Sequence, residues 1–447
     1  MKGKTNMNSQ IDFVNEKTRT GLFKMTVPLI VAMMLNMAYN LVDSLWIGNL
    51  LGENAMAALT SSTPIILLLT SIGMGATNGL AILLSQAIGA KDNMKTKRIL
   101  STSLISTVAL CITLTILCEF SLDGILHLLH TPTEIFSMAK EYLSVYLLGF
   151  LPVFLYLYFT AVLRSYGNTI FQVIAILLCT ILNMILDPIF IHIIGFSGAA
   201  IATILSQSIA LILMVGYIMK KKLFHFSISL FAWTDVKTLL CKSLPSIIQQ
   251  SIPPLSTSVL TSIVSSFGVT AIAAYGITGK LETVLFYPAM ALNMAITTIV
   301  GQCIGAKRLD LAKDYLKTSL FYGTGLLIVL SALVVTFAGN LSHLFLNNAN
   351  TAAIVKTYFL IVGIGYILYT VTSSFMGAIN GLGKPGMGMY LMIFYYIIIR
   401  MPLAYLLSHT NFELDGVWLA ILISHVIAAV SAAILFNFLL LKLERNQ

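Results

Sequence analysis

Three acidic residues, Asp43, Asp187 and Glu282, lie inside apolar stretches of this sequence that are long enough to cross a bilayer as helices. A charged side chain at the centre of a bilayer costs about 2.5–3.5 kcal/mol even on the scales that give the lowest values. Such a residue therefore faces a water-filled cavity with polar partners, or takes up a proton. Cation or proton binding is the chemistry that these three acids suggest first.

The first two acids can form one site. Asn183 precedes Asp187 by four residues and so shares its helical face, and Thr203 reaches a comparable depth on the next apolar stretch. The expected cation-coupling residues are Asp43, Asn183, Asp187 and Thr203. Their oxygens suit a hard cation such as sodium, or a carboxyl pair that shares one proton. A polar cluster that only fixes helix packing is the alternative, but two acids in lipid are expensive for packing alone.

Five further residues are candidates for contact with a substrate. Tyr39 and Asn40 lie one turn before Asp43, and Met37 is close by with an adaptable side chain. Lys280 and Glu282 are two residues apart and so point to different faces of one helix, where each could line a cleft or reach the interface.

Two other polar residues in apolar stretches are harder to place. Arg400 has no obvious partner in the sequence, and we interpret His425 as a hydrogen-bonded polar residue rather than a ligand. The chain shows no clustered nucleophile or metal ligands, so we expect no metal apart from the possible sodium ion, no cofactor and no enzyme activity. An intramembrane enzyme that uses Asp43 and Asp187 as an acid pair is a less favoured alternative.

The composition is that of a membrane protein. The 447 residues are 58% hydrophobic and only 10% charged, whereas soluble proteins are about 25% charged. The apolar stretches are 22–47, 55–84, 99–120, 135–162, 169–192, 198–219, 243–266, 271–303, 315–338, 353–380, 387–408 and 416–440. We therefore expect an all-α polytopic membrane protein with twelve transmembrane helices.

The basic residues indicate how the chain crosses the membrane. Outside the apolar stretches, Lys and Arg fall before the first stretch, after the even-numbered stretches and at the end, while the alternate loops contain none. By the positive-inside rule both termini are cytoplasmic, with residues 1–20 as a cytoplasmic tail and no cleaved signal peptide. The net charge of +9 is therefore a topology signal and does not predict a nucleic-acid partner.

The chain contains two copies of one unit. The loop QAIGAKDNMKTKRILSTSL, which starts at Gln86, matches QCIGAKRLDLAKDYLKTSL, which starts at Gln302, at ten of 19 positions without a gap. Copies of six helices enter the membrane in the same sense and are related by an axis along the membrane normal. We expect an N-lobe at 21–222, a cytoplasmic linker at 223–240 and a C-lobe at 241–447. Two such lobes are typical of transporters that work by alternating access.

The combined motifs resemble a known family over essentially the whole chain. The motifs are YNLVDSLWIGNLLGENAMAAL (39–59), LNMILDPIF (182–190), AAYGITGKLE (273–282) and the paired QxIGAK loops. They resemble the multidrug and toxic compound extrusion (MATE) family, in the bacterial branch like DNA-damage-inducible protein F (DinF-like). The resemblance implies two pseudo-symmetric six-helix lobes in a V, and cation-coupled export of organic compounds that are often cationic.

The resemblance also implies roles for particular residues. Asp43 would be the acid for coupling and substrate release, and Asn183, Asp187 and Thr203 would complete its first-lobe cation network, with Tyr39 and Asn40 nearby. The pattern from Lys280 to Glu282 matches the basic residue, apolar residue and Glu of that branch. Residues 244–267 and 353–380 contain no acid, unlike other branches of the family, so coupling would depend on the first lobe.

We therefore expect a proton- or sodium-driven antiporter in the cytoplasmic membrane that exports amphipathic small organic compounds. A flippase or exporter of a lipid-linked or endogenous metabolite is the alternative, although a lipid-linked sugar flippase would need a cleft rich in Arg and Lys to hold phosphates. No nucleotide is expected, since there is no GxxxxGK[ST] loop. Besides substrate and lipid we expect no partner, and a monomer.

Overall fold

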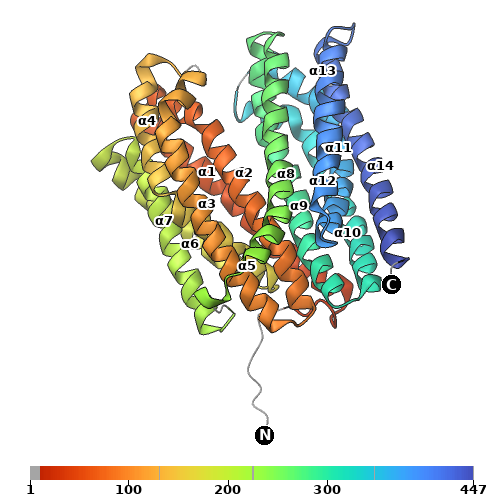
Figure 1. The fold of residues 1–447 in the computed structure, drawn as a ribbon. Coiled ribbons are helices and arrows are strands. Elements are labelled where there is room, and N and C mark those ends of the chain that lie inside the picture. Colours follow the sequence, from red (N-terminus) through yellow and green to blue (C-terminus); the bar gives the residue numbers. More distant parts are fainter. Residues whose placement is uncertain (1–10, 130, 224–225, 347, 446–447) are drawn as a thin grey trace. The chain divides into compact units, whose positions relative to one another are not determined.

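The computed structural model describes residues 11–129, 131–223, 226–346 and 348–445, and its ordered elements there are all helical (Figure 1). In chain order they are α1 (Thr18–Leu51), α2 (Glu53–Gly89), α3 (Asn93–Leu128), α4 (Thr133–Leu148), α5 (Phe150–Ser165), α6 (Thr169–Ile194), α7 (Ser197–Lys220), the 3₁₀ turn η1 (Ile228–Leu230), α8 (Trp233–Ser265), α9 (Val269–Gly305), α10 (Leu309–His343), α11 (Ala349–Gly381), α12 (Pro385–Met392), the π-helical η2 (Ile393–Arg400), α13 (Met401–Ser408) and α14 (Glu413–Glu444).

These helices correspond to the twelve expected membrane spans. Within the described ranges, ten helices are long and apolar enough to cross a bilayer, with α12, η2 and α13 counted as one. The pair α4 and α5, bent by 50° at Gly149, adds an eleventh. The twelfth is α8, which has a similar length but contains more Ser, Thr and Gln residues. The protein is therefore a multi-pass membrane protein.

The chain divides into two compact units. Unit 1 contains Val27–Ile247, and unit 2 contains Asp12–Thr26 and Ile248–Gln447. The start of α1 thus belongs to unit 2, where the hydroxyl of Tyr315 donates to the carbonyl of Phe13 at 3.1 Å. The start of α8 belongs to unit 1, so the division lies within α8. The predicted lobe boundaries at 222 and 241 stay a prediction.

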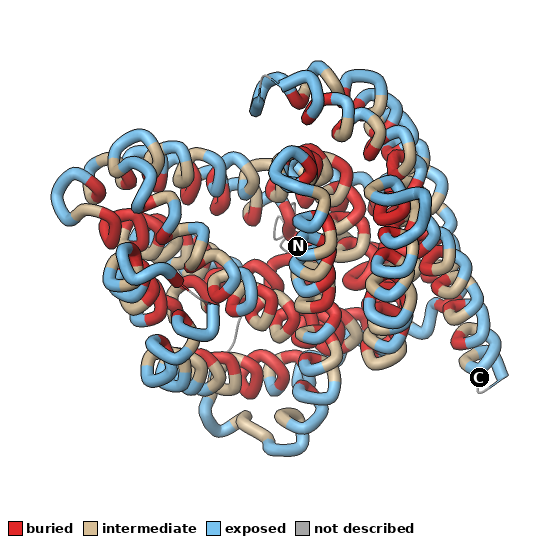
Figure 2. The backbone as a smooth tube through the Cα atoms, turned by 90° about the horizontal axis from the view of Figure 1, so that it is seen from above, coloured by how far each residue is buried: buried red, intermediate tan, exposed pale blue. Residues whose placement is uncertain are grey.

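Each unit has its own apolar core, and its outer helix faces are apolar as well. Phe150, Phe154 and Tyr158 are fully buried in unit 1, and Trp418 and Tyr358 in unit 2. In Figure 2 many helices show buried and exposed residues on opposite sides of one helix. The exposed large apolar side chains of these helices have the character of a lipid-facing surface, because hydrocarbon is the solvent around a membrane span.

The duplication is visible in the backbone as well as in the residues. Lys91 and Lys307, at matching positions of the two IGAK loops, both adopt a positive φ, of 55° and 59°. Their amides donate to the carbonyls of Ile88 and Ile304, at 2.9 and 3.0 Å, so the same left-handed turn ends α2 and α9. Gly52 and Gly268 form a second matched pair, with φ of 80° and 96°.

Two glycines on α2 let the start of α8 pack against its backbone within unit 1. A Cβ atom on Gly75 would lie 2.3 Å from the Cα of Ile247, and one on Gly79 would lie 2.6 Å from the Cα of Ser243. The hydroxyl of Ser243 donates to the carbonyl of Ala76 at 3.1 Å. Small residues four apart are a common means of close helix packing in membranes.

We predict that Gly75→Ala lowers the thermal unfolding midpoint of the detergent-purified protein. The new methyl group forces the two backbones apart, and overpacking typically costs about 1–3 kcal/mol. The matched control is Gly216→Ala on α7, where a Cβ meets nothing within 4 Å. The control should be neutral or stabilising, because Ala favours a helix over Gly by about 1 kcal/mol. Equal midpoints for the two variants would contradict the close packing.

Candidate functional site in unit 1

The polar face of α6 forms the buried base of the site. Asn183 and Asp187 are both 0% exposed, and the amide nitrogen Nδ2 of Asn183 donates to Oδ1 of Asp187 at 2.8 Å. The spacing of four residues places both side chains on one helical face, as expected from the sequence. Asp187 is thus a carboxyl group in a membrane helix, held by a neighbour on the same helix.

Asp43 reaches this face from α1. The carboxyl groups of Asp43 and Asp187 lie within range of direct electrostatic interaction with each other. Asp43 is half-buried, whereas Asp187 is fully buried. Residues 144 positions apart in the chain therefore form one carboxyl pair.

A second contact connects α1 to α7 beside the acids. The hydroxyl of Tyr39 donates to Oγ1 of Thr203 at 3.0 Å, and both residues are buried. Ser206 donates to the carbonyl of Thr203 at 2.9 Å and lies 3.7 Å from the sulfur of Cys179 on α6. The structure thus brings all four expected cation-coupling residues and Tyr39 to one place.

Three acceptor atoms of this cluster have no donor. Oδ1 of Asp43, Oδ1 of Asn183 and Oδ2 of Asp187 are buried and have no hydrogen-bond partner among the residues that the structure describes. An unsatisfied buried polar atom costs about 1–3 kcal/mol, and more when it is charged. The cluster therefore lacks positive charge or protons. Its unsatisfied oxygens could accept a proton or serve as ligands of a hard cation such as sodium.

Sequence reasoning missed the two tyrosines of α4 that complete the surroundings. Tyr142 and Tyr146 are buried and lie within electrostatic range of Asp43. The ring of Tyr142 stacks on Phe196 at a centroid distance of 4.5 Å, which fixes its position. Their spacing of four residues on a short helix was the available signal, but nothing in the sequence connects α4 with α1.

The remaining candidates of α1 lie outside this cluster. Asn40 is exposed, and its amide donates to the carbonyl of Asn36 at 2.8 Å, while Met37 is half-buried. They stay predictions as substrate contacts. In the described part of the chain no three His, Cys, Asp or Glu residues form a group that could hold a metal ion. Any cation at Asp43 and Asp187 therefore relies on neutral oxygens such as those of Asn183 and Thr203.

Unit 2 contains a separate polar cluster, in which the half-buried Glu282 of α9 meets two buried tyrosines. The hydroxyls of Tyr358 and Tyr366, both on α11, donate to Oε1 of Glu282 and lie 3.1 Å from each other. Lys280 points elsewhere, with its ammonium group 5.2 Å from the ring of Phe345. The expectation that Lys280 and Glu282 occupy different faces agrees with these contacts.

The structure supplies partners for Arg400, which has no obvious partner in the sequence. Arg400 is buried, its Nε donates to Oγ of Ser424 at 2.8 Å, and Nη2 lies 3.2 Å from Nε2 of His425. The guanidinium group also lies 4.3 Å from the ring centroid of Tyr396. Because an arginine can only donate, Nε2 of His425 accepts and the proton is on Nδ1. The helices that supply these partners could not be paired from the sequence.

Comparisons with known proteins agree with the duplicated fold. A family model described as MatE matches residues 28–189 and 245–406, once in each copy. The probable multidrug resistance protein YoeA of Bacillus subtilis is 28% identical over 88% of both chains. The FAD transporter of Shewanella oneidensis is 26% identical over 92% of both. A solved structure described as an outward-facing multidrug resistance MATE family transporter has a TM-score of 0.92, 21% identity and full coverage of both chains.

The fold and the site define an integral membrane transporter built from two six-helix lobes, and not an enzyme. The chain belongs to the MATE family, because the family model matches well over half of its residues. The expected family and the expected twelve-helix, two-lobe fold are thereby confirmed.

The tyrosine contacts of Glu282 lead to a second prediction, on thermal stability. Tyr358→Phe should lower the thermal unfolding midpoint, because it removes one of the two hydrogen bonds to the half-buried Glu282 carboxylate, and a hydrogen bond to a charged group contributes about 1.5–3 kcal/mol. In a Glu282→Leu background the same change should cost much less, so the two substitutions should be non-additive. Tyr405→Phe, at a residue that is 58% exposed, is the control and should leave the midpoint unchanged. Additive effects would show that the contact contributes nothing to stability.

Proposed function

We propose that the protein is a cation-coupled antiporter that exports amphipathic small organic compounds, often cationic, by alternating access. The observation that carries the proposal is the set of three unsatisfied acceptor oxygens on Asp43, Asp187 and the adjacent Asn183. Two neighbouring ionised carboxyl groups in the low dielectric of a membrane protein interior repel each other strongly. A proton or a sodium ion removes that repulsion, and so this pair is suited to respond to an ion gradient.

Two cations satisfy this chemistry in different ways. A proton placed on either acid turns one acceptor into a donor, so the carboxyl pair can share it. A sodium ion would need the carboxylate oxygens together with the neutral oxygens of Asn183 and Thr203. For a proton, each pH unit across the membrane supplies about 1.4 kcal/mol. If one monovalent cation is exchanged for one monovalent substrate, only the concentration gradient contributes.

The position of the site on α1 suggests how ion binding is transmitted. Asp43 and Tyr39 both belong to α1, and Pro28 lies inside the same helix, next to the point where the chain passes from unit 2 to unit 1. Proline removes one backbone hydrogen bond and permits a bend. We propose that loading of the acid pair changes the contacts of α1 with α6 and α7, and that α1 bends or repacks near Pro28 to release the substrate.

The substrate class follows from similarity rather than from a defined pocket. Relatives such as YoeA are named as probable multidrug resistance proteins, which supports export of drug-like compounds. The alternative is export or flipping of an endogenous metabolite or of a lipid-linked compound. The relative named FAD transporter supports the metabolite alternative, because that name describes a large, polar metabolite.

Several features of the cellular setting belong to this proposal. The alternation of loops with and without Lys and Arg supports a location in the cytoplasmic membrane with both termini in the cytoplasm. We propose that the chain acts as a monomer without a cofactor. Assignment to the DinF-like branch and the substrate roles of Lys280 and Glu282 stay predictions.

Asp43→Asn and Asp187→Asn should each abolish gradient-driven export. Either change removes the ionisable partner that makes the pair sensitive to the gradient, while the side-chain shape is kept. The measurement is transport of a fluorescent cationic dye by proteoliposomes, with proton and sodium gradients imposed separately. The gradient that drives transport by the native chain identifies the coupling ion, and both variants should lose transport under that gradient.

The control for this experiment is Asp123→Asn, which alters an exposed acid paired with Lys140 and should transport like the native chain. Full gradient-driven export by Asp43→Asn would refute the coupling role. If the native chain moves no dye under either gradient, FAD and lipid-linked compounds are the next substrates to test.

A further inference from the structure

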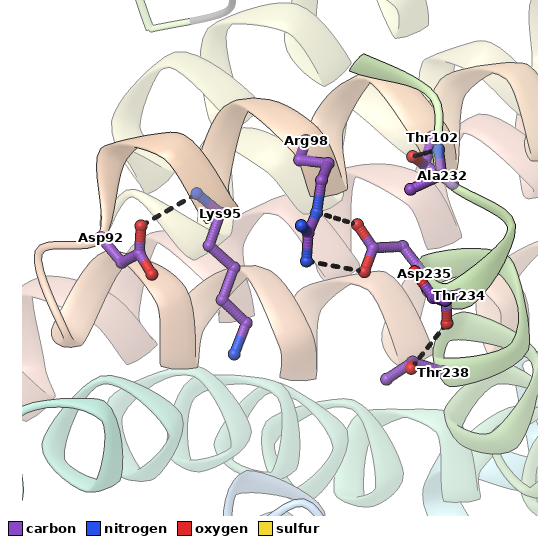
Figure 3. A network of polar contacts seen from close by, with 8 residues as sticks. All are labelled: Asp92, Lys95, Arg98, Thr102, Ala232, Thr234, Asp235 and Thr238. Atoms are coloured by element: carbon purple, nitrogen blue, oxygen red, sulfur yellow. Dashed lines mark hydrogen bonds and ion pairs between the residues drawn. The ribbon is translucent and has the colours of Figure 1, made fainter.

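The segment that joins α7 to α8 is fixed to unit 1 along one side. We name residues 226–233 the linker segment. The backbone amide of Ser227 donates to Oγ of Ser101 at 3.1 Å. The backbone amide of Ala232 donates to Oγ1 of Thr102 at 3.2 Å (Figure 3). Both acceptors lie on α3, so the linker segment lies against that helix.

An ion pair secures the point where the segment enters α8. Arg98 of α3 contacts both carboxylate oxygens of Asp235, with Nη2 3.1 Å from Oδ1 (Figure 3). The Asp235 side chain is only 16% exposed, and two-pronged contacts of this kind fix orientation as well as distance. The linker segment is therefore held at both ends before any partner binds.

The other side of the linker segment presents large apolar side chains outward. Ile228 is 74% exposed, Trp233 is 77% exposed and Phe226 is 46% exposed. The rings of Phe231 and Trp233 contact each other edge to face at 5.3 Å. Single exposed apolar residues are common on proteins, but three within eight residues form an apolar surface. The amides of Ser227 and Ala232 in the same segment donate to α3.

This apolar surface continues the lipid-facing surfaces of α7 and α8. The segment follows α7, where Met219 is 65% exposed, and precedes α8, where Leu240 and Leu244 are 48% and 54% exposed. Both helices cross the membrane, so the apolar surface begins where lipid-facing surface ends. Tryptophan is enriched at this depth, because its ring is amphipathic.

Basic residues stand beside the apolar surface. Lys220 ends α7, Lys221 and Lys222 follow it, and all three are exposed, as is Lys237 in the first turns of α8. Lys221 lies 6.0 Å from the ring of Tyr217, and none of the four forms an ion pair with the acids that the structure describes. Cations next to exposed aromatic and aliphatic side chains are the pattern of segments that lie in a membrane interface.

We propose that the linker segment is a membrane-interface anchor that inserts Phe226, Ile228 and Trp233 among the lipids of one leaflet, with Lys220–Lys222 on anionic headgroups. By the topology proposed above this is the cytoplasmic leaflet. The anchor is already ordered by its contacts with α3, so insertion orders little further chain. The connection between the two lobes is thus tied to the bilayer plane, whatever substrate or ion the transporter uses.

Trp233 allows a direct test in vesicles. The protein has three tryptophans, and the emission of native protein minus that of Trp233→Phe isolates Trp233, while Trp46 and the fully buried Trp418 contribute equally to both. The probes are lipids brominated on the acyl chain near the headgroup, and iodide in the water. We expect the brominated lipid to quench most of the difference signal and iodide to leave it nearly unchanged.

Two other results would overturn the proposal. Quenching by iodide without quenching by brominated lipid would place Trp233 in water. Protection from both quenchers would place it against protein, either a second copy or another segment of this chain.

The headgroup contact has its own test. In brominated phosphatidylglycerol vesicles the quenching should exceed that in brominated phosphatidylcholine, and Lys220→Gln, Lys221→Gln and Lys222→Gln together should remove the difference. The control carries the same change in charge in the turn before α3 and at the start of that helix, with Lys91→Gln, Lys95→Gln and Lys97→Gln, and should keep the difference. Equal quenching of the native chain in both lipids, or loss of the difference in the control, would refute the headgroup contact.

Discussion

The contact between Asp43 and Asp187 is the constraint on which the unit 1 site depends. Two acids in a membrane are unfavourable unless partners or bound cations offset their charge. The surrounding helices supply part of that compensation: Asn183 donates to Asp187, and the contact of Tyr39 with Thr203 fixes α1 beside α7. The compensation is incomplete, because three acceptor oxygens still lack a donor. This incomplete compensation supports the proposed binding of a cation or a proton at the pair.

The two copies of the duplicated unit have diverged in their polar interiors. Their loops keep the same left-handed turns, as Lys91 and Lys307 show, so the backbone plan is common to both. Unit 1 contains a carboxyl pair with unsatisfied oxygens, whereas unit 2 contains Glu282 with two tyrosine donors and Arg400 with Ser424 and His425. A carboxylate with two donors is well satisfied. This asymmetry is consistent with ion coupling in one lobe and a structural polar network in the other.

Close contact between helices is achieved by different means at different points. Gly75 and Gly79 permit backbone contact between α2 and α8, where an added methyl group would collide. The linker segment, which precedes α8, instead donates two backbone hydrogen bonds to side chains of α3. The ion pair of Arg98 with Asp235 then connects the start of α8 to the same helix. The chain between the lobes is therefore held to unit 1 over a continuous stretch from the linker segment into α8. That arrangement leaves the apolar side of the linker segment free to meet lipid.

The sequence by itself determined the membrane class, the twelve spans, the duplication and the shared face of Asn183 and Asp187, because hydropathy, loop charge and helical period are local properties of a chain. Only the tertiary structure decided which helices meet. The partners of Arg400, the tyrosines that bind Glu282, and the approach of Tyr142 and Tyr146 to Asp43 all cross between helices. In hydrocarbon every helix satisfies its own backbone, so the order of its residues does not specify its neighbours, and side-chain packing between helices makes that choice.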